Sequence, residues 1–235
     1  MSSPDHPPAE TAFRPSDYTA AILRLLLLRE AWVRGARVLD VGCGSGVLLA
    51  AAGALGATEL CGVDIEADAV AASARLLETL DLESEVEIRQ GSLFEPIRGR
   101  CFDLILANLP HFPMKPAQID GRLPSWSYGG TDGRALLDRF IANLSDHLAP
   151  YGRAVLVHNA FIDLEATRTA AGRQGLQVSV ADTVLVPLPP AKLARMTPAI
   201  LRRESGRSIH RFSTYAFGEV HVLTMDRESN RNGPQ

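Results

Sequence analysis

The 235-residue sequence lacks the cysteine patterns that mark a disulfide-stapled or zinc-binding protein. Its three cysteines are Cys43, Cys61 and Cys101, and no two of them form a C-x-x-C pair. Each lies in or beside an apolar run, so we interpret them as small buried side chains of a protein in a reducing, cytoplasmic environment. The six histidines are scattered along the chain. No metal site is therefore expected.

Long apolar runs and an excess of charge are also missing. Residues 20–28 are apolar, but Arg24 interrupts them and the run is too short to cross a bilayer. Residues 1–15 are polar and proline-rich, which argues against a signal peptide and predicts a flexible segment. The net charge of −3 excludes nucleic-acid binding through overall charge, although a local basic face stays open. A hydrophobic content of 46% excludes a disordered chain.

Against this background, one glycine-rich stretch stands out. The apolar run 38–41 ends at Gly42, Gly44 and Gly46, and a helical pattern begins at Val47. A strand that turns through glycines into a helix brings backbone N–H groups and the positive end of the helix dipole to one point. The spacing is G-x-G-x-G rather than the dinucleotide pattern G-x-G-x-x-G, because position 47 is valine. We interpret it as a nucleotide-binding turn; the alternative is a turn kept only for tight strand–helix packing.

Two acids accompany this turn. Asp40 precedes it, and Asp64 ends the next apolar run about twenty residues further on. In nucleotide-binding α/β folds, the acid that binds the ribose lies about twenty residues after the glycine turn, as Asp64 does.

The periodicity of the rest of the chain predicts an α/β fold. Strands alternate with helices through most of the sequence, which favours a doubly wound parallel sheet. Residues 111–132 have no clear periodicity, and an irregular stretch of that length is usually functional. We expect one domain over residues 16–225 and a flexible tail at 226–235. The expected strands are 37–41, 59–63, 86–89, 102–107, 153–157, 178–186 and 215–225, and the expected helices are 17–32, 47–55, 67–79, 133–148 and 162–174.

A second motif, Asn108-Leu109-Pro110-His111, follows the expected strand 102–107 directly. The carboxyl ends of parallel strands are where ligands bind in open α/β sheets. The Asn108 side-chain oxygen and the Pro110 main-chain oxygen would be two acceptors for a planar NH2 group, held for attack. His111 or Phe112 would pack on the flat group. The alternative is a strand-ending turn without chemistry.

Together, these motifs resemble those of the class I S-adenosylmethionine-dependent methyltransferases. The tetrapeptide resembles the N-P-P-Y motif of members that methylate planar nitrogens, with Leu109 and His111 as departures. The segment from Gly129 to Phe140 further resembles the release-factor glutamine N-methyltransferases, in the short form without the helical N-terminal domain. The resemblance implies S-adenosyl-L-methionine as cofactor and a Rossmann-like, mostly parallel seven-stranded sheet whose last strand is antiparallel. It also implies that the first and fourth strands lie side by side, so the second motif should face the glycine turn.

The resemblance also implies roles for individual residues. Ser92 stands where the family usually has an acid that contacts adenine. The expected catalytic residues are Asn108, Pro110 and His111; the expected cofactor-binding residues are Asp40, Gly42, Gly44, Gly46, Asp64, Ile65, Ser92, Leu93 and Asn108; and the expected substrate-binding residues are Phe112, Trp126 and Arg134.

Several functions stay open at this stage. The first is methylation of a protein glutamine side chain, with a release factor or a ribosomal protein as the partner. The others are amino-methylation of an rRNA or tRNA base, methylation of a small molecule in secondary metabolism, and cofactor binding without catalysis. Residues 187–214 carry six basic side chains against Glu204, so this segment is expected to face RNA or an acidic protein surface. His158 and Asn159 follow the strand 153–157 and either line the substrate side or are satisfied within a loop.

Overall fold

The computed structural model describes residues 15–80, 82, 84–115 and 127–227. The expected flexible segments 1–15 and 226–235 fall almost entirely outside these residues, as does Trp126. The strands are β1 (Arg37–Val41), β2 (Glu59–Asp64), β3 (Glu85–Gln90), β4 (Phe102–Ala107), β5 (Leu148–Asn159), β6 (Leu176–Pro187), β7 (Ile209–Phe212) and β8 (Tyr215–Arg227). The α-helices are α1 (Asp17–Leu28), α2 (Val47–Ala54), α3 (Ala67–Glu78), α5 (Ala135–Leu144), α6 (Leu164–Gly172), α7 (Pro190–Arg195) and α8 (Pro198–Glu204).

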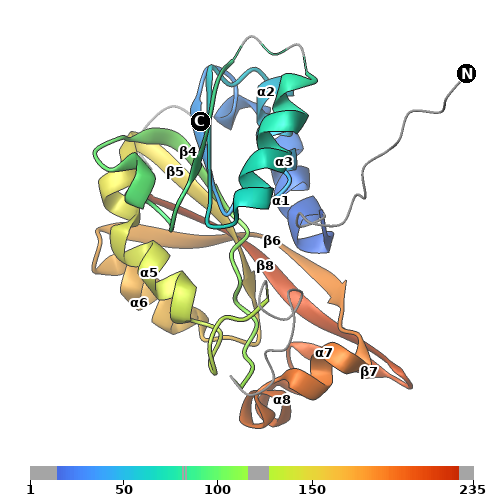
Figure 1. Cartoon of the computed structure of the whole chain (residues 1–235). Coiled ribbons are helices and arrows are strands. Elements are labelled where there is room, and N and C mark those ends of the chain that lie inside the picture. The colour runs from blue at the N-terminus through green and yellow to red at the C-terminus, as the bar shows by residue number, and fades with distance from the viewer. Residues whose placement is uncertain (1–14, 81, 83, 116–126, 228–235) are drawn as a thin grey trace, which may run out of the picture.

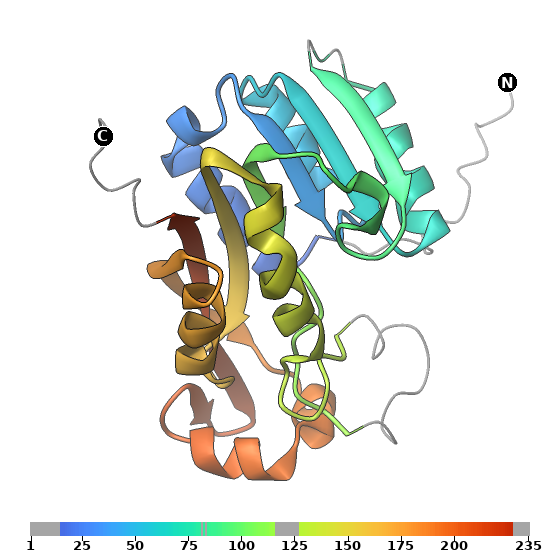
Figure 2. The same ribbon diagram turned by 90° about the vertical axis from the view of Figure 1, so that its left-hand side faces the viewer.

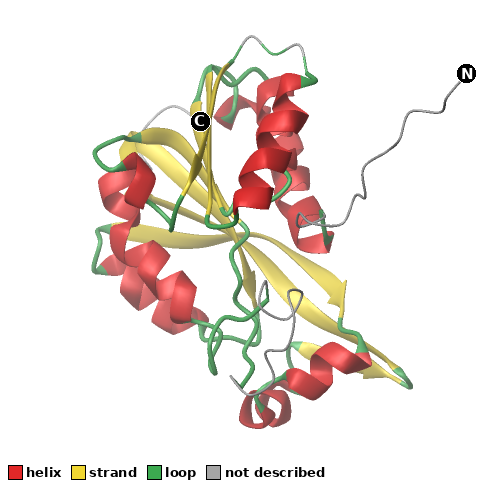
Figure 3. Ribbon diagram, viewed as in Figure 1, coloured by secondary structure: helices red, strands yellow, loops and turns green. Residues whose placement is uncertain are grey.

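The described strands form one sheet in the order β3-β2-β1-β4-β5-β8-β6 (Figures 1 and 3). Strands β3, β2, β1, β4 and β5 pair in parallel, whereas β8 is antiparallel to both β5 and β6. The first and fourth strands are therefore neighbours, with Val41 paired to Ala107. The order of the strands reverses at this pair, and their carboxyl ends lead into the two sequence motifs.

Helices cover both faces of the sheet (Figures 1 and 2). Helices α1, α2 and α3 pack on one face, and α5 and α6 pack on the other. The strand sequences explain the two layers, because β4 is apolar at nearly every position: Leu104 and Leu106 belong to the α1–α2 core, while Ile105 and Ala107 belong to the α5–α6 core. A central parallel strand buried on both faces is expected to read this way.

The expected mostly parallel sheet with an antiparallel last strand is confirmed, and the structure adds an eighth strand. The four-residue strand β7 pairs with the start of β8. It lies on the same side of β8 as β5, whose pairing with β8 ends at Asn159. Segment 187–214 was expected as an insertion between the last two strands, and it folds into α7, α8 and β7. It extends the sheet at the lower end of Figure 1.

Three expected elements differ from those of the structure by four or more residues at one end. The helix expected at 17–32 is α1, which ends at Leu28 and is followed by a 3-10 turn at Glu30–Trp32. The helix expected at 133–148 is α5, which ends at Leu144 and is followed by a 3-10 turn. Strand β5 begins at Leu148, before Pro150 and Gly152, because a register shift between Phe102 and Leu104 accommodates the irregular start. Among the described helices, none is both long and apolar enough to cross a membrane.

Candidate active site at the carboxyl edge of the sheet

The glycine turn after β1 lies against both the neighbouring strand and the second motif. The backbone N–H groups of Gly42 and Cys43 donate to the Val63 carbonyl at 2.7 and 3.1 Å, which ties the turn to the end of β2. A Cβ atom on Gly42 would lie 3.3 Å from the Leu109 side chain. The turn and the segment 108–111 therefore face each other, as their places after adjacent strands predict.

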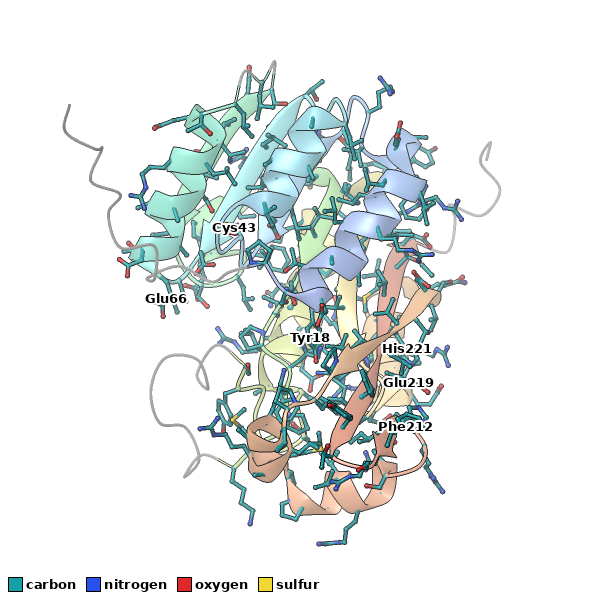
Figure 4. The ribbon with its side chains drawn as sticks, turned by 90° about the vertical axis from the view of Figure 1, so that its right-hand side faces the viewer. Tyr18, Cys43, Glu66, Phe212, Glu219 and His221 are labelled. Carbon is teal, nitrogen blue, oxygen red and sulfur yellow. The ribbon has the colours of Figure 1, made fainter. Side chains whose placement is uncertain are left out.

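These motifs border a cavity of about 540 Å³, within the range of small-molecule sites. Tyr18 approaches it from α1 and Glu66 from the start of α3, and both are labelled in Figure 4. Of the residues expected from the sequence, those that line the cavity are Gly42, Gly44, Asp64, Ile65, Ser92, Leu93, Asn108, Pro110, His111 and Phe112.

Asp64 holds the rim of this cavity together. One carboxylate oxygen accepts the Gly44 N–H at 2.9 Å, and the other accepts the Glu66 N–H at 3.0 Å. A carboxylate offers about four lone-pair positions, so each oxygen can accept a further hydrogen bond from the cavity. This arrangement suits a ligand with two vicinal hydroxyl groups.

A flat apolar surface adjoins Asp64. Ile65 is 66% exposed, which is unusual for a side chain of its size, and it borders the cavity together with Leu93. Leu93 has a φ of +50°, a conformation that non-glycine residues seldom adopt and that is often found at functional sites. On the same side, the Ser92 hydroxyl accepts a hydrogen bond from Arg139 at 3.4 Å. These groups would suit a planar ring with polar edges.

A hydrogen bond from the first turn of α1 holds the Asn108 side chain. Its amide nitrogen donates to the Thr19 hydroxyl at 3.1 Å, which fixes the plane of the side chain. The Asn108 amide oxygen is then the group available as an acceptor from a ligand. Thr19 also accepts the Ser16 N–H at 3.3 Å, so the first turn of α1 positions this acceptor.

His111 is buried and uncharged. Its Nδ1 donates to the Leu109 carbonyl at 2.5 Å, and burial lowers the pKa of its imidazole to about 4. The imidazole ring meets the edge of the Tyr18 ring, with centroids 5.8 Å apart. His111 thus fills the place of an aromatic residue in the wall of the cavity.

Among the other residues that line the cavity, Tyr18, Asn159 and Lys192 are polar side chains outside the list of expected site residues. The Tyr18 hydroxyl donates to the Asn159 side chain at 2.9 Å, and the Asn159 amide donates to the His111 carbonyl at 3.3 Å. These bonds link α1, β5 and the second motif. The sequence left open whether His158 and Asn159 line the substrate side. Asn159 lines the cavity, whereas His158 is buried, with its Nε2 at 3.0 Å from the Thr167 hydroxyl.

Arg134 does not border the cavity, which argues against its expected contact with substrate. Its guanidinium is buried and donates to the Asp163 carbonyl at 2.7 Å and the Thr167 hydroxyl at 2.8 Å. It also pairs with Asp138 one helical turn along α5. Arg134 therefore joins α5 to α6, a role that its position in the sequence does not reveal.

Gly46 also lies outside the cavity lining, although the sequence places it with the two other glycines. An added Cβ would lie 2.9 Å from the Ser73 Cα, at a backbone φ of +80°. Gly46 allows the start of α2 to approach α3 closely.

We expect Gly46→Ala to lower the free energy of unfolding by roughly 1–3 kcal/mol, because the new methyl group meets backbone and the positive φ disfavours a side chain. Urea denaturation measures this change. The matched control is Gly172→Ala at the end of α6, where an added Cβ meets nothing within 4 Å. Equal stabilities of the two variants would contradict this role for Gly46.

Asp40 is fully buried and does not line the cavity, so the structure gives it no direct contact with a cofactor. One of its carboxyl oxygens has no hydrogen-bond partner among the described residues. Burial raises the pKa of this carboxyl to about 8, and the nearby Asp64 charge adds to the effect. Asp40 is therefore largely protonated at neutral pH.

The raised pKa of Asp40 predicts a pH-dependent stability. An unfolded aspartate titrates near pH ~3.9, so between about pH 4 and 8 the folded state keeps a proton that the unfolded state loses. This carboxyl therefore destabilises the fold increasingly as pH rises through that window, with the full cost above pH ~8. We expect Asp40→Asn to gain stability relative to the native protein as pH rises, measured by urea denaturation across the window. A difference that stays constant would contradict the raised pKa.

The cavity residues fit S-adenosylmethionine. The glycine turn at Gly42, where a Cβ atom would crowd Leu109, would suit its amino-acid part. The Asp64 carboxylate would suit its ribose, and the apolar surface of Ile65 and Leu93 would suit its adenine ring. Within the described parts of the chain, no group of three or more His, Cys, Asp or Glu residues is placed to hold a metal ion.

Comparison with known proteins identifies the family. Residues 12–112 match the profile of the ribosomal protein L11 methyltransferase (PrmA) family. A Methanocaldococcus jannaschii protein named "Putative protein N5-glutamine methyltransferase" is 30% identical over 175 residues, which cover 74% of this chain and 87% of that protein. A release factor glutamine methyltransferase from Gloeobacter violaceus is 33% identical over 127 residues, covering 50% of this chain and 44% of that protein.

A solved structure shares the fold of this chain. The crystal structure of a ribosomal protein L11 methylase from Lactobacillus delbrueckii superposes with a TM-score of 0.57 at 19% identity, covering 94% of this chain and 83% of that one. The chain spans most of the length of the archaeal relative but less than half of the release factor enzyme. The chain belongs to the class I S-adenosylmethionine-dependent methyltransferases, in the family that contains the protein N5-glutamine methyltransferases.

Proposed function

We propose that this enzyme transfers the methyl group of S-adenosylmethionine to the side-chain amide nitrogen of a glutamine in a protein. The observation that carries the proposal is the Asn108 side chain. Its amide nitrogen is committed to Thr19, which leaves its oxygen as an acceptor beside Pro110 in the cavity wall. The similarity to protein glutamine methyltransferases supports the same substrate class.

In this proposal, one side of the cavity holds the cofactor. Gly42 and Gly44 would bind its amino-acid part, Asp64 its ribose hydroxyls, and Ile65, Ser92 and Leu93 its adenine ring. When bound, the cofactor supplies an electrophilic methyl group on a sulfonium. Asp40 and Gly46 would act indirectly, since they shape the turn from behind.

The other side of the cavity would position the acceptor. An amide nitrogen is a poor nucleophile because its lone pair is delocalised, and deprotonating it in advance is costly. Holding its two N–H groups between the Asn108 side-chain oxygen and the Pro110 carbonyl would aim the nitrogen at the methyl group, and the methylated nitrogen would then release one proton to solvent. This contribution is positional, with electrostatic stabilisation of the positive charge that develops on nitrogen. His111 and Phe112 would form the wall beside the amide plane.

The substrate class can be tested by incubating the enzyme with methyl-labelled cofactor and separated protein, RNA and small-molecule fractions. We expect label in the protein fraction, and mass spectrometry of digested peptides should place one added methyl group on a glutamine side chain. Label confined to RNA or to small molecules would contradict the proposal.

One observation favours RNA as a second candidate substrate. Arg202 on α8, Arg207 in the turn that follows it and Arg211 on β7 have exposed side chains, and no ion pair is formed by them within the described residues. If RNA is the substrate, binding should weaken with salt in proportion to the number of phosphate contacts. Labelling of the RNA fraction would select this alternative.

A further inference from the structure

Lys192 places a cation in the acceptor side of the cavity. It lies on α7, in the segment between β6 and β8, and lines the cavity with Tyr18 and Phe112. Its Nζ is 5.1 Å from the centroid of the Tyr18 ring and 4.9 Å from that of the Phe112 ring. Two aromatic faces thus hold the ammonium group in place.

The charge of this cation is not balanced by any acidic side chain among the residues that the structure describes. Within the residues that the structure describes, Lys192 has no carboxylate within ion-pair distance, and the acids that line the cavity are Asp64 and Glu66 at its cofactor side. Burial lowers the pKa of the Lys192 ammonium, and its charge contributes to the lowered pKa of His111. A partly buried charge without a partner is costly, so the arrangement favours an anion supplied by a ligand.

We propose that Lys192 binds a carboxylate of the methyl acceptor, so that the enzyme selects glutamines that have an acidic residue close by in the peptide. This inference rests on the proposed function and names the substrate class for the same site. The ammonium is a single cation between two aromatic rings, and it suits a single small anion next to the amide that Asn108 holds.

A peptide carboxylate fits this position better than a nucleic-acid backbone. Phosphodiester chains are gripped by several cations that follow the backbone, whereas Arg202, Arg207 and Arg211 do not line the cavity. Lys192 is the cation beside the second motif, and Arg139 lies at Ser92 on the adenine side.

The test uses matched heptapeptides with one central glutamine, in which one flanking position at a time is Glu, Gln or Lys. Calorimetry of the full chain saturated with S-adenosylhomocysteine measures binding without turnover. At one flanking position, we expect the Glu peptide to bind about tenfold more tightly than its Gln counterpart, a size typical of one partly buried ion pair. Lys192→Met should remove this preference, and Lys192→Glu should transfer it to the Lys peptide.

The matched control is Arg195→Met, on the same helix but outside the cavity lining, which should keep the preference. The inference is overturned if the native enzyme shows no charge preference, if the preference survives Lys192→Met, or if an oligoribonucleotide binds more tightly than every peptide. Turnover is read separately. Peptides that bind with the expected charge preference but are never methylated on glutamine would overturn the proposed function while leaving the role of Lys192 intact.

Discussion

Asp64→Ala is expected to weaken binding of S-adenosylhomocysteine by about 10²-fold or more. A charged acceptor contributes roughly 1.5–3 kcal/mol per hydrogen bond, and the proposed site has two ribose hydroxyls on this carboxylate. The substitution also removes the acceptor of the Gly44 and Glu66 N–H groups, which shape the rim of the cavity. Isothermal titration calorimetry measures the affinity directly.

The control for Asp64→Ala is Asp64→Asn, which keeps the shape of the side chain and one acceptor oxygen. Its affinity should fall between those of the native enzyme and Asp64→Ala. Thermal unfolding of both variants without ligand separates loss of the acceptor from loss of the fold. Unchanged affinity in a folded Asp64→Ala protein would contradict the ribose-binding role.

The sequence predicted the central part of the fold well because its signals are local. Strand β1 has the predicted bounds Arg37–Val41, and β4 has the predicted bounds 102–107. Both strands are apolar runs that end at a turn, and such runs can be recognised from the hydrophobic pattern of the sequence alone. The parallel pairing of β1 and β4 followed from the resemblance, and it brings the two motifs together.

The end of the sheet was less predictable because non-local pairing stabilises it. Strand β7 has only four residues, Ile209–Phe212, and two of them are His210 and Arg211. Its ladder is formed with the first residues of β8, and the Ile209 carbonyl also accepts the Gly206 N–H at 2.8 Å, so nothing within its own four residues specifies a strand. Helices α7 and α8 are short, and each begins at a proline, Pro190 and Pro198, a start signal that is weak without a longer pattern.

The candidate site was predictable where it follows a strand and hidden where it does not. Asp64 and Asn108 come directly after β2 and β4, and both line the cavity. Tyr18 and Lys192 come from helices at opposite ends of the chain, and they reach the site only through the packing of α1 and α7. A signal existed for Tyr18, because it is a large aromatic in the polar first turn of a predicted helix.

Two expected site residues share a motif or a neighbourhood with the site but do not line the cavity. Gly46 belongs to the G-x-G-x-G pattern, yet a Cβ atom at this position would meet Ser73 of α3 rather than the cavity. Arg134 begins a helix near the site, yet its side chain turns toward α6. Spacing shows that residues are neighbours along the chain, whereas the direction of a side chain depends on the tertiary fold.

Asn108→Ala is expected to reduce the rate of methyl transfer by about 10²–10³-fold, the usual effect of removing one preorganised polar group. Affinity for S-adenosylhomocysteine should stay close to that of the native enzyme, because the proposed acceptor role of Asn108 faces the substrate. Single-turnover transfer to the glutamine peptide that binds best, with saturating cofactor, separates this effect from a binding defect.

Variants of Thr19, the hydrogen-bond partner of Asn108, test the same role from a second residue. Thr19→Val keeps the shape of the side chain but removes the hydroxyl that holds the Asn108 amide, so the rate should fall by roughly tenfold while substrate affinity changes little. Thr19→Ser keeps that hydroxyl and should behave like the native enzyme. Asn108→Asp keeps an acceptor oxygen but loses the N–H that Thr19 accepts, and we expect partial activity. A native single-turnover rate in Asn108→Ala would mean that the segment 108–111 is only a turn and that the methyl acceptor binds elsewhere.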